Sequence, residues 1–485
     1  MKDSKLCAPP IPCDPEQGSI TDIALDGVPG TRLLIDHTDT EVVLLPRPTS
    51  SPDDPLNWGW KRKYIAQSIV FIWAFMLGAA TLSPAVTYAG VISELDASTE
   101  YLNTGAAYAW TGKPVVQSPL RFGRRYLYFS SALSGAASQV VTTTAHNKAA
   151  FVGGRILLGF GAAPFEQLPA LTVNDQFYVH QRGLGLSIYT LAITTGSFLG
   201  PVAAGFVVDS MGWRWVYWFY AIFLLAIAVL IFLGLEETEI ETHDAHPLPT
   251  PIWRIAINPF LLLAGLIIWW CSIMYGFGVA WLTIMAYEST TIFTLYGFSS
   301  SSLGLTNIAP LIVSCLVVWL GGPGTGKFMV WKARRNNGVM EPETRIYSVF
   351  FAGPITGAGL ILYGVGATRS VHWAGPIIGM GMIGSALPIA AEVALGYVSE
   401  SYPSLAGEAT TAVILIRNAI GCGMTFAISP WIESSGLQNA FVAVGLLAFG
   451  VFVSGGLLIW KGKACRRLEA KRYYAMVALQ SDTAL

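Results

Sequence analysis

The chain has 485 residues, of which 53% are hydrophobic and only 12% are charged, and its mean hydropathy is +0.52. A soluble domain carries about 25% charged residues, so the composition excludes an ordinary soluble protein and favours many membrane crossings of ~20 residues each. The formal net charge of −1 offers no strong field for nucleic acid. The six cysteines are scattered at spacings that fit neither a metal site nor a disulfide framework. We therefore expect no metal and no cofactor.

The apolar segments fall into two sets of six, which predicts an all-α membrane protein with twelve transmembrane helices in two six-helix bundles. The expected spans are 64–89, 104–120, 126–145, 149–171, 184–207 and 215–235, then 259–285, 300–320, 346–367, 372–397, 407–430 and 437–460. The corresponding units are a disordered cytoplasmic tail, an N-terminal bundle, a short cytoplasmic linker, a C-terminal bundle and a cytoplasmic C-terminal tail, over 1–60, 61–235, 236–255, 256–460 and 461–485.

The second span is the least regular of the twelve, because it is short and carries Lys113-Pro114 in its middle. A lysine at the centre of a membrane helix costs roughly 2.5–3.5 kcal/mol unless it faces protein or water. Pro114 also removes a helix hydrogen bond.

Basic residues predict the orientation. If the N-terminus is cytoplasmic and all twelve spans cross, 23 Lys and Arg lie inside, 3 lie outside and 3 fall within spans. Membrane proteins keep Lys and Arg in their cytoplasmic loops, so we expect both termini in the cytoplasm. The localisation is then integral and multi-pass. We expect the plasma membrane, with a vacuolar or other internal membrane as the alternative.

A basic turn follows the second span. It contains Arg121, Gly123, Arg124 and Arg125. One interpretation is simple anchoring on the cytoplasmic face. The other is a gating loop, whose arginines pair with acidic helix ends in one conformation of the protein.

The fifth span carries a helix-bend motif, formed by Gly196, Gly200, Pro201 and Gly205. Gly196 and Gly200 share one helix face, where small residues let helices approach closely, and Pro201 permits a bend. Ordinary close packing is one interpretation, and a point about which the helix rocks during transport is the other.

Ionisable residues inside the expected spans are candidates for substrate binding or proton coupling, because charge is costly within hydrocarbon. Arg155 and Glu166 lie eleven residues apart in the fourth span, on nearly the same face of a straight helix and about 16 Å apart. Glu392 lies in the tenth span, and the pair Arg417-Asn418 lies in the eleventh. A structural ion pair with a neighbouring helix is the alternative role for the charged members.

Residues 321–328 (Gly-Gly-Pro-Gly-Thr-Gly-Lys-Phe) bear a superficial likeness to a phosphate-binding loop. Phe328 stands where Mg²⁺ needs Ser or Thr, and the segment follows an apolar helix instead of a strand. We interpret it as a glycine-rich cytoplasmic turn. The sequence has no Ser/His/Asp order, HExxH pattern or CxxC pair, so we expect no enzymatic activity.

Together these features resemble the major facilitator superfamily, and within it the fungal drug:proton antiporter type, from about Asp53 to Trp460. The basic turn looks like the loop between helices two and three, Arg155 to Gly159 like the fourth-helix motif, and Gly196 to Gly205 like the antiporter motif. The most specific similarities to the fungal group are 54–58 (Asp-Pro-Leu-Asn-Trp), 212–215 (Gly-Trp-Arg-Trp) and 335–345 (Arg-Asn-Asn-Gly-Val-Met-Glu-Pro-Glu-Thr-Arg).

The resemblance implies two six-helix bundles around a central cavity, alternating access, coupling to the proton gradient and export of small organic molecules. Two departures concern gating. Leu120 stands where the family loop usually has an acid, and the corresponding acid of the second half is missing before Lys327.

We therefore expect a secondary active transporter that exports a small organic compound, such as a drug, toxin or secondary metabolite, in exchange for protons. Its partners would be the small-molecule substrate, protons and the lipid bilayer, with no nucleic acid, and the protein would be a monomer. Two alternatives stay open: proton-coupled uptake of a nutrient or polyamine-like solute, and a non-transporting relative with degraded gating motifs.

Overall fold

The computed structural model describes residues 28–33, 54–98, 101–102, 123–177, 179–238, 259–336, 338–369 and 372–481. The expected second span with Lys113-Pro114, Arg121 of the basic turn, and most of the N-terminal tail and the linker lie outside these residues. The described chain is almost entirely helical, with a single two-stranded sheet within the described ranges. The expected all-α membrane class is therefore confirmed.

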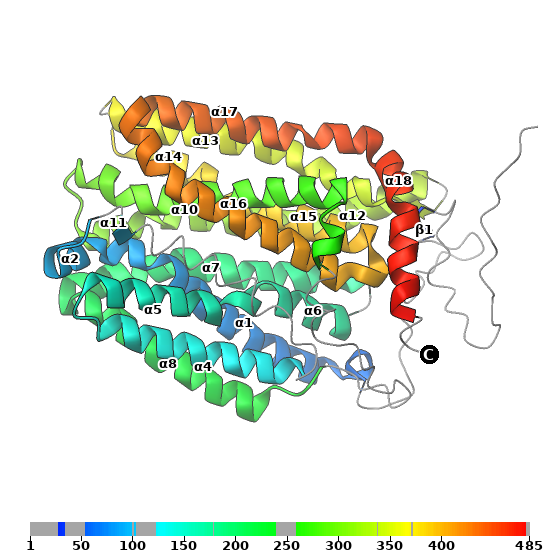
Figure 1. Cartoon of the computed structure of the whole chain (residues 1–485), viewed down its shortest axis with the longest axis horizontal. Helices are drawn as coiled ribbons and strands as arrows, with labels where there is room; N and C mark the ends of the chain where they lie inside the picture. Colours follow the sequence, from blue (N-terminus) through cyan, green and yellow to red (C-terminus); the bar gives the residue numbers. More distant parts are fainter. Residues whose placement is uncertain are drawn as a thin grey trace, which may run out of the picture.

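The N-terminal half contains α1 to α8 and the C-terminal half contains α10 to α18, and the two halves lie side by side with most helices along the long axis (Figure 1). The first half comprises η3 (Pro55–Asn57), α1 (Trp60–Leu82), α2 (Pro84–Leu95), α4 (Arg124–Thr143), α5 (Lys148–Gly161), η5 (Ala163–Phe165), α6 (Gln167–Gln176), α7 (Val179–Met211) and α8 (Trp213–Gly234). The second comprises α10 (Leu266–Thr294), α11 (Ser300–Thr306), α12 (Ile308–Arg335), η6 (Pro342–Ser348), α13 (Val349–Thr368), α14 (Ala374–Ile383), α15 (Ala386–Ser401), η7 (Pro403–Leu405), α16 (Ala406–Ser435), α17 (Leu437–Val453) and α18 (Gly455–Ser481).

Within the described ranges, nine helical segments are long and apolar enough to cross a membrane, and ten if the bent pair of α5 with η5 and α6 counts as one span. They coincide with ten of the twelve expected spans. At the third expected span, α4 is 20 residues long but contains four Ser, two Thr and two Arg residues, so it falls short of the hydropathy of the others.

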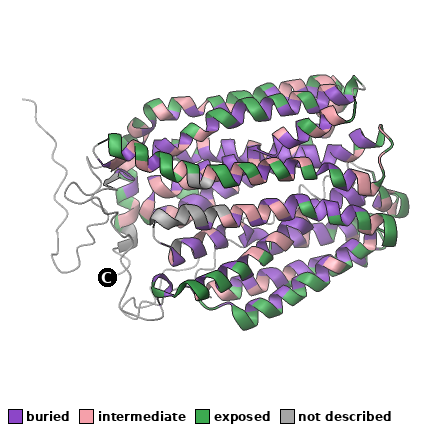
Figure 2. Ribbon diagram, turned by 180° about the vertical axis from the view of Figure 1, so that it is seen from behind, coloured by how far each residue is buried: buried purple, intermediate pink, exposed green. Residues whose placement is uncertain are grey.

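The surface of the bundle is apolar, as a lipid solvent requires. Buried residues lie between the helices and exposed residues lie on the outward faces (Figure 2). Many of the exposed residues are large and apolar, including Phe223, Leu225, Val229 and Leu233 along α8. An exposed apolar surface of this size would be an aggregation hazard in water, whereas in hydrocarbon it costs nothing.

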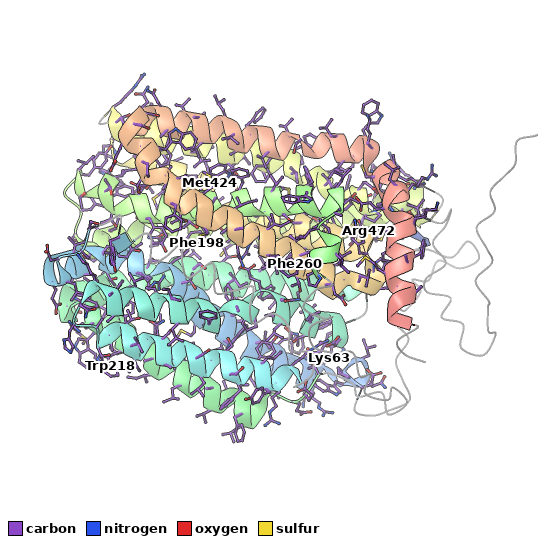
Figure 3. The ribbon with its side chains drawn as sticks, viewed as in Figure 1. Lys63, Phe198, Trp218, Phe260, Met424 and Arg472 are labelled. Atoms are coloured by element: carbon purple, nitrogen blue, oxygen red, sulfur yellow. The ribbon has the colours of Figure 1, made fainter. Side chains whose placement is uncertain are left out.

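The two ends of the bundle differ. We call them the α18 end, where α18 turns across the bundle, and the α2 end, opposite to it (Figure 1). The labelled basic residues Lys63 and Arg472 lie towards the α18 end, and Trp218 lies towards the α2 end (Figure 3). The expected C-terminal tail is helical as far as Ser481, as part of α18.

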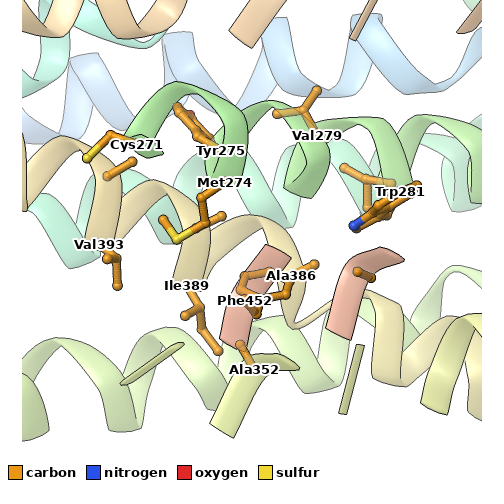
Figure 4. Close-up of a cluster of buried hydrophobic side chains, with 14 of the residues drawn as sticks. Cys271, Met274, Tyr275, Val279, Trp281, Ala352, Ala386, Ile389, Val393 and Phe452 are labelled. Atoms are coloured by element: carbon orange, nitrogen blue, oxygen red, sulfur yellow. The ribbon is translucent and has the colours of Figure 1, made fainter. Parts of the chain in front are cut away.

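The core of the C-terminal half is built where α10, α13, α15 and α17 meet (Figure 4). Met274 of α10, Ile389 of α15 and Phe452 of α17 are buried there together with Ala352 of α13. Small and large side chains both contribute to this core, as close packing between helices requires. Tyr275 also belongs to α10, and its hydroxyl reaches Glu166 of the N-terminal half.

Glycines allow α7 to pack closely on α1. A Cβ atom at Gly196 would lie 2.1 Å from the carbonyl oxygen of Phe75, and one at Gly200 would lie 2.7 Å from Ala79. Gly205 similarly approaches the backbone of Ser300 in the C-terminal half. The helix continues through Pro201. Close packing therefore accounts for these glycines, and rocking about the motif stays a prediction.

Two further features differ from sequence expectation or were not foreseen. The segment 321–328, expected to be a turn, is helical as part of α12. Residues Arg32–Leu33 form β1, which pairs antiparallel with β2 (Val339–Met340). Arg466 of α18 supports this pairing by donating to the Pro29 carbonyl oxygen at 2.7 Å. The N-terminal segment thus contacts the C-terminal half.

The glycine packing predicts a specific loss of stability for Gly196→Ala. The added methyl would overlap the Phe75 carbonyl, so we expect α1 and α7 to separate at a cost of about 1–3 kcal/mol. The measurement is the melting temperature of the purified protein in detergent. Gly153→Ala is the control, because nothing lies within 4 Å of a Cβ atom there. Equal melting temperatures for the two variants would contradict the packing argument.

Candidate transport site and gating contacts

Glu166 lies at a break in the fourth span. Helix α5 ends at Gly161, a short 3₁₀ turn follows, and α6 continues at an angle of 41°. On a straight helix Arg155 and Glu166 would lie on nearly one face, but this bend gives them different neighbours. Arg155 contacts α1, whereas Glu166 points to the C-terminal half.

A buried ion pair joins the two halves. The Arg417 guanidinium of α16 contacts the Glu166 carboxylate, and the Arg417 side chain is fully buried. Tyr275 of α10 donates its hydroxyl to the same carboxylate at 2.9 Å, and the guanidinium lies 4.7 Å from the Tyr275 ring centroid. Asn418 accepts from the Arg417 Nε at 3.1 Å. The structure therefore brings together Glu166, Arg417 and Asn418.

Other polar groups surround this pair. Gln167 donates to Thr411 Oγ1 at 2.5 Å and to the Gly407 carbonyl oxygen at 3.3 Å, so it is a second contact between the halves. Tyr189 donates to the Phe165 carbonyl oxygen at 3.1 Å, which supports the turn just before Glu166. Within the described residues, the buried Asn418 Nδ2 has no hydrogen-bond partner. We define these residues with Tyr275 as the central polar cluster: Glu166, Gln167, Tyr189, Tyr275, Thr411, Arg417 and Asn418.

Glu392 lies apart from the central polar cluster. It is part of α15, and its Oε2 would be 3.2 Å from a Cβ atom at Gly321 of α12. It also lies within electrostatic range of Arg345. The structure thus does not bring Glu392 to the Glu166 carboxylate. No group of three or more His, Cys, Asp or Glu side chains in the described residues is arranged to hold a metal ion.

The basic turn contacts an acidic partner that the sequence argument did not assign. Gly123 has a φ of +78°, and Glu237, just after α8, accepts from the backbone N–H groups of Arg124 at 2.8 Å and Arg125 at 3.1 Å. A carboxylate is favourable at this position because the first N–H groups of a helix lack partners. The acidic run from Glu236 was visible in sequence, but its contact with α4 was not.

The side chains of the same turn bind inside the N-terminal half. Arg124 forms an ion pair with Asp175 near the end of α6. Arg125 donates to the carbonyl oxygen of Phe232 in the last turn of α8, where the helix dipole favours a cation. The C-terminal half has a similar pair, since Arg345 contacts Glu400 near the end of α15. Each pair ties the start of one helix to the end of another.

The motif 212–215 makes a contact at the α2 end. Glu94 of α2 accepts from Trp213 Nε1 at 2.6 Å and from Arg214 at 2.7 Å. The Arg214 hydrogen bond, and then that of Trp213, hold the pKa of the Glu94 carboxyl below its usual range. Arg214 also donates to the Thr143 carbonyl oxygen at 2.6 Å. The motif therefore connects α2, α4 and α8.

A family model described as Major Facilitator Superfamily matches residues 69–424. An uncharacterized MFS-type transporter of Schizosaccharomyces pombe is 24% identical, with 91% of each chain covered. Efflux pump radE of Floropilus chiversii is 26% identical, with 86% of this chain and 84% of the relative covered. Among solved structures, the proton:xylose symporter XylE is similar with a TM-score of 0.63 and 14% identity, over 83% of this chain and 96% of that one.

The family match covers most of the chain, and the helical fold agrees with that of the similar solved structure. The protein is therefore an integral, multi-pass membrane transporter and not an enzyme. The chain belongs to the Major Facilitator Superfamily.

Proposed function

We propose that the protein exports a small, mostly apolar organic compound in exchange for protons, by alternating access, and that Glu166 is the proton-binding group. The observation that carries this proposal is the Glu166–Arg417 ion pair between the two halves. Protonation of Glu166 removes the attraction to Arg417, so the halves separate more easily. Arg417 keeps its charge at every physiological pH and retains the Asn418 oxygen and the Tyr275 ring as partners.

The direction and the substrate class rest on two considerations. One relative of similar length is named an efflux pump. The cluster also offers aromatic side chains, Tyr189 and Tyr275, beside a single carboxylate from Glu166. Such a site suits a compound with an apolar body and few polar groups. The plasma membrane is the proposed location.

Uptake of a polyamine-like solute is less well supported. A carrier for a solute with several positive charges needs several acids facing the transport site. Glu392, the second candidate acid, lies beside α12 and Arg345 and not beside Glu166. The carboxylate of the cluster is also already occupied by Arg417 and Tyr275.

The other alternative is that the protein does not transport, because Leu120 stands where the family loop usually has an acid. The Glu237 carboxylate binds the start of α4, and Asp175 pairs with Arg124, so the turn has acidic partners despite that substitution. We propose that these contacts make a working gating latch on the cytoplasmic side.

The proton-coupling role predicts the behaviour of Glu166→Gln. Glutamine keeps the size of the side chain and can still accept from Tyr275, but it cannot ionise. We expect transport to slow about tenfold, which corresponds to about 1.4 kcal/mol of activation free energy, and to become nearly independent of pH between about 5 and 8. The measurement is efflux from yeast lacking its own pumps, using the compound whose accumulation the unaltered protein lowers most.

Glu392→Gln is the matched control, because it makes the same change outside the central polar cluster. It should retain the pH dependence of transport. Normal, pH-dependent efflux by the Glu166→Gln protein would refute the assignment of the coupled proton to Glu166. Efflux that becomes independent of pH only in the Glu392→Gln protein would assign the coupling role to Glu392 instead.

The latch predicts a rescue by charge exchange. Arg124→Asp and Asp175→Arg should each lower transport about tenfold, since each leaves two like charges facing one another and weakens the latch by about 1.4 kcal/mol. The double variant restores an attraction and should recover most of the activity. Both single variants and the double variant are compared by efflux, at equal abundance in the membrane. An inactive double variant with normal abundance would show that the pair does not act as a latch.

A further inference from the structure

The first span is interrupted between α1 and α2. Helix α1 ends at Leu82 and α2 begins at Pro84. Proline has no backbone N–H, so the carbonyl of Ala80, four residues earlier, loses the donor that it would have in a continuous helix. A carbonyl left without a partner inside a membrane protein is costly, because hydrocarbon offers no water to replace the donor.

Arg155 supplies the missing donors. Its Nη1 donates to the Ala80 carbonyl oxygen at 3.2 Å and its Nη2 donates to the Thr81 carbonyl oxygen at 3.1 Å. These carbonyls lie at the C-terminal end of α1, where the helix dipole favours a cation. The Arg155 residue is 3% exposed, and none of the ion pairs within the described residues involves it. Its partners are therefore the two backbone carbonyls of α1 and, through a side-chain hydrogen bond, Tyr287 of α10.

The break determines where α2 lies against the C-terminal half. Thr290 of α10 donates to the carbonyl oxygen of Ala85 at 3.0 Å, in the first turn of α2. One turn further on, the Tyr88 ring stacks on Tyr287 of α10, with centroids 5.8 Å apart and an interplanar angle of 10°. These contacts place the first turns of α2, just after the break, against α10.

Two other helices of the N-terminal half, α7 and α8, also contact the residues at this break. The Ser83 hydroxyl lies 2.6 Å from the Tyr220 hydroxyl of α8, and Gly200 of α7 packs against Ala79. Residues at the break are therefore in contact with α7, with α8 and with Arg155 from α5. Among these groups, Arg155 replaces the hydrogen bond that proline removed.

We propose that Arg155 is a positioning residue: it caps the end of α1 at the break before Pro84 and thereby keeps α2 seated against α10 at the α2 end of the bundle. In this role Arg155 does not carry the coupled proton. The inference requires no substrate and does not depend on the proposed function.

A double-mutant cycle tests the inference on the purified full-length protein. Arg155→Met removes both donors, so the melting temperature should fall by roughly 5 °C. Pro84→Ala restores an N–H for the Ala80 carbonyl and should change little by itself. Combined with Arg155→Met, Pro84→Ala should recover about half of the loss, because the Thr81 carbonyl still lacks its partner.

Pro201→Ala is the matched control, since Pro201 lies inside α7 and its replacement restores no donor to α1. It should not rescue Arg155→Met. Additive effects of Arg155→Met and Pro84→Ala, or equal rescue by Pro201→Ala, would overturn the capping role.

A labelling experiment tests the seating of α2. Val91 of α2 is fully buried in the cluster that contains Tyr88 and Tyr287. In a protein without other cysteines, Val91→Cys should react slowly with a membrane-impermeant maleimide, and Arg155→Met should speed that reaction several-fold. Val444→Cys, fully buried in the C-terminal half, is the control for general unfolding.

Adding Pro84→Ala should slow the Val91→Cys reaction again. Unchanged Val91→Cys labelling in the Arg155→Met protein would overturn the inference. Glu166→Gln should leave this labelling rate as it is, so the outcome for Arg155 is distinguishable from the outcome for proton coupling.

Discussion

The structure depends on one constraint: inside hydrocarbon, each polar group must find its partner within the protein. Within a helix the backbone N–H and C=O groups bond to one another. At helix ends these groups lack such partners, and side chains must supply them. Arg155 binds the carbonyls exposed at the end of α1, and Glu237 binds the N–H groups exposed at the start of α4. Charge follows the same rule, because the buried Arg417 guanidinium contacts Glu166 and Asn418.

The ion pairs divide into two kinds with different consequences. Arg124–Asp175 and Arg345–Glu400 each connect elements within one half, so the latch proposed for Arg124 and Asp175 acts inside the N-terminal half and not between the halves. Glu166–Arg417 connects the two halves, so a change in its charge alters how they are held together. Alternating access requires rigid halves and a contact between them that can be broken. The distribution of these pairs meets both requirements.

Close backbone approaches complement the charged contacts. Gly196 and Gly200 bring α7 against α1 within the N-terminal half, while Gly205 approaches Ser300 of the C-terminal half. Contacts between small residues involve mainly dispersion forces and carry little directional restraint. They let the halves touch closely at α7 without locking the interface, and the directional restraint comes from the polar contacts of Glu166 and Gln167.

Hydropathy and charge by themselves determined the membrane class and ten of the twelve expected spans, because each span must be apolar over about 20 residues whatever it packs against. The order of the short motifs supplied the family resemblance. Hydropathy and charge also identified Glu166, Arg417 and Asn418 as buried polar candidates, since such residues are rare in membrane helices. Only the tertiary structure decided which of them meet. A straight-helix argument cannot foresee the break after Gly161 that separates Arg155 from Glu166. Nor can it find Glu237, which reaches α4 from more than a hundred residues away. Long-range partners such as Glu237 and α4 depend on how the helices cross in space. The local periodicity of a sequence contains no information about these crossings.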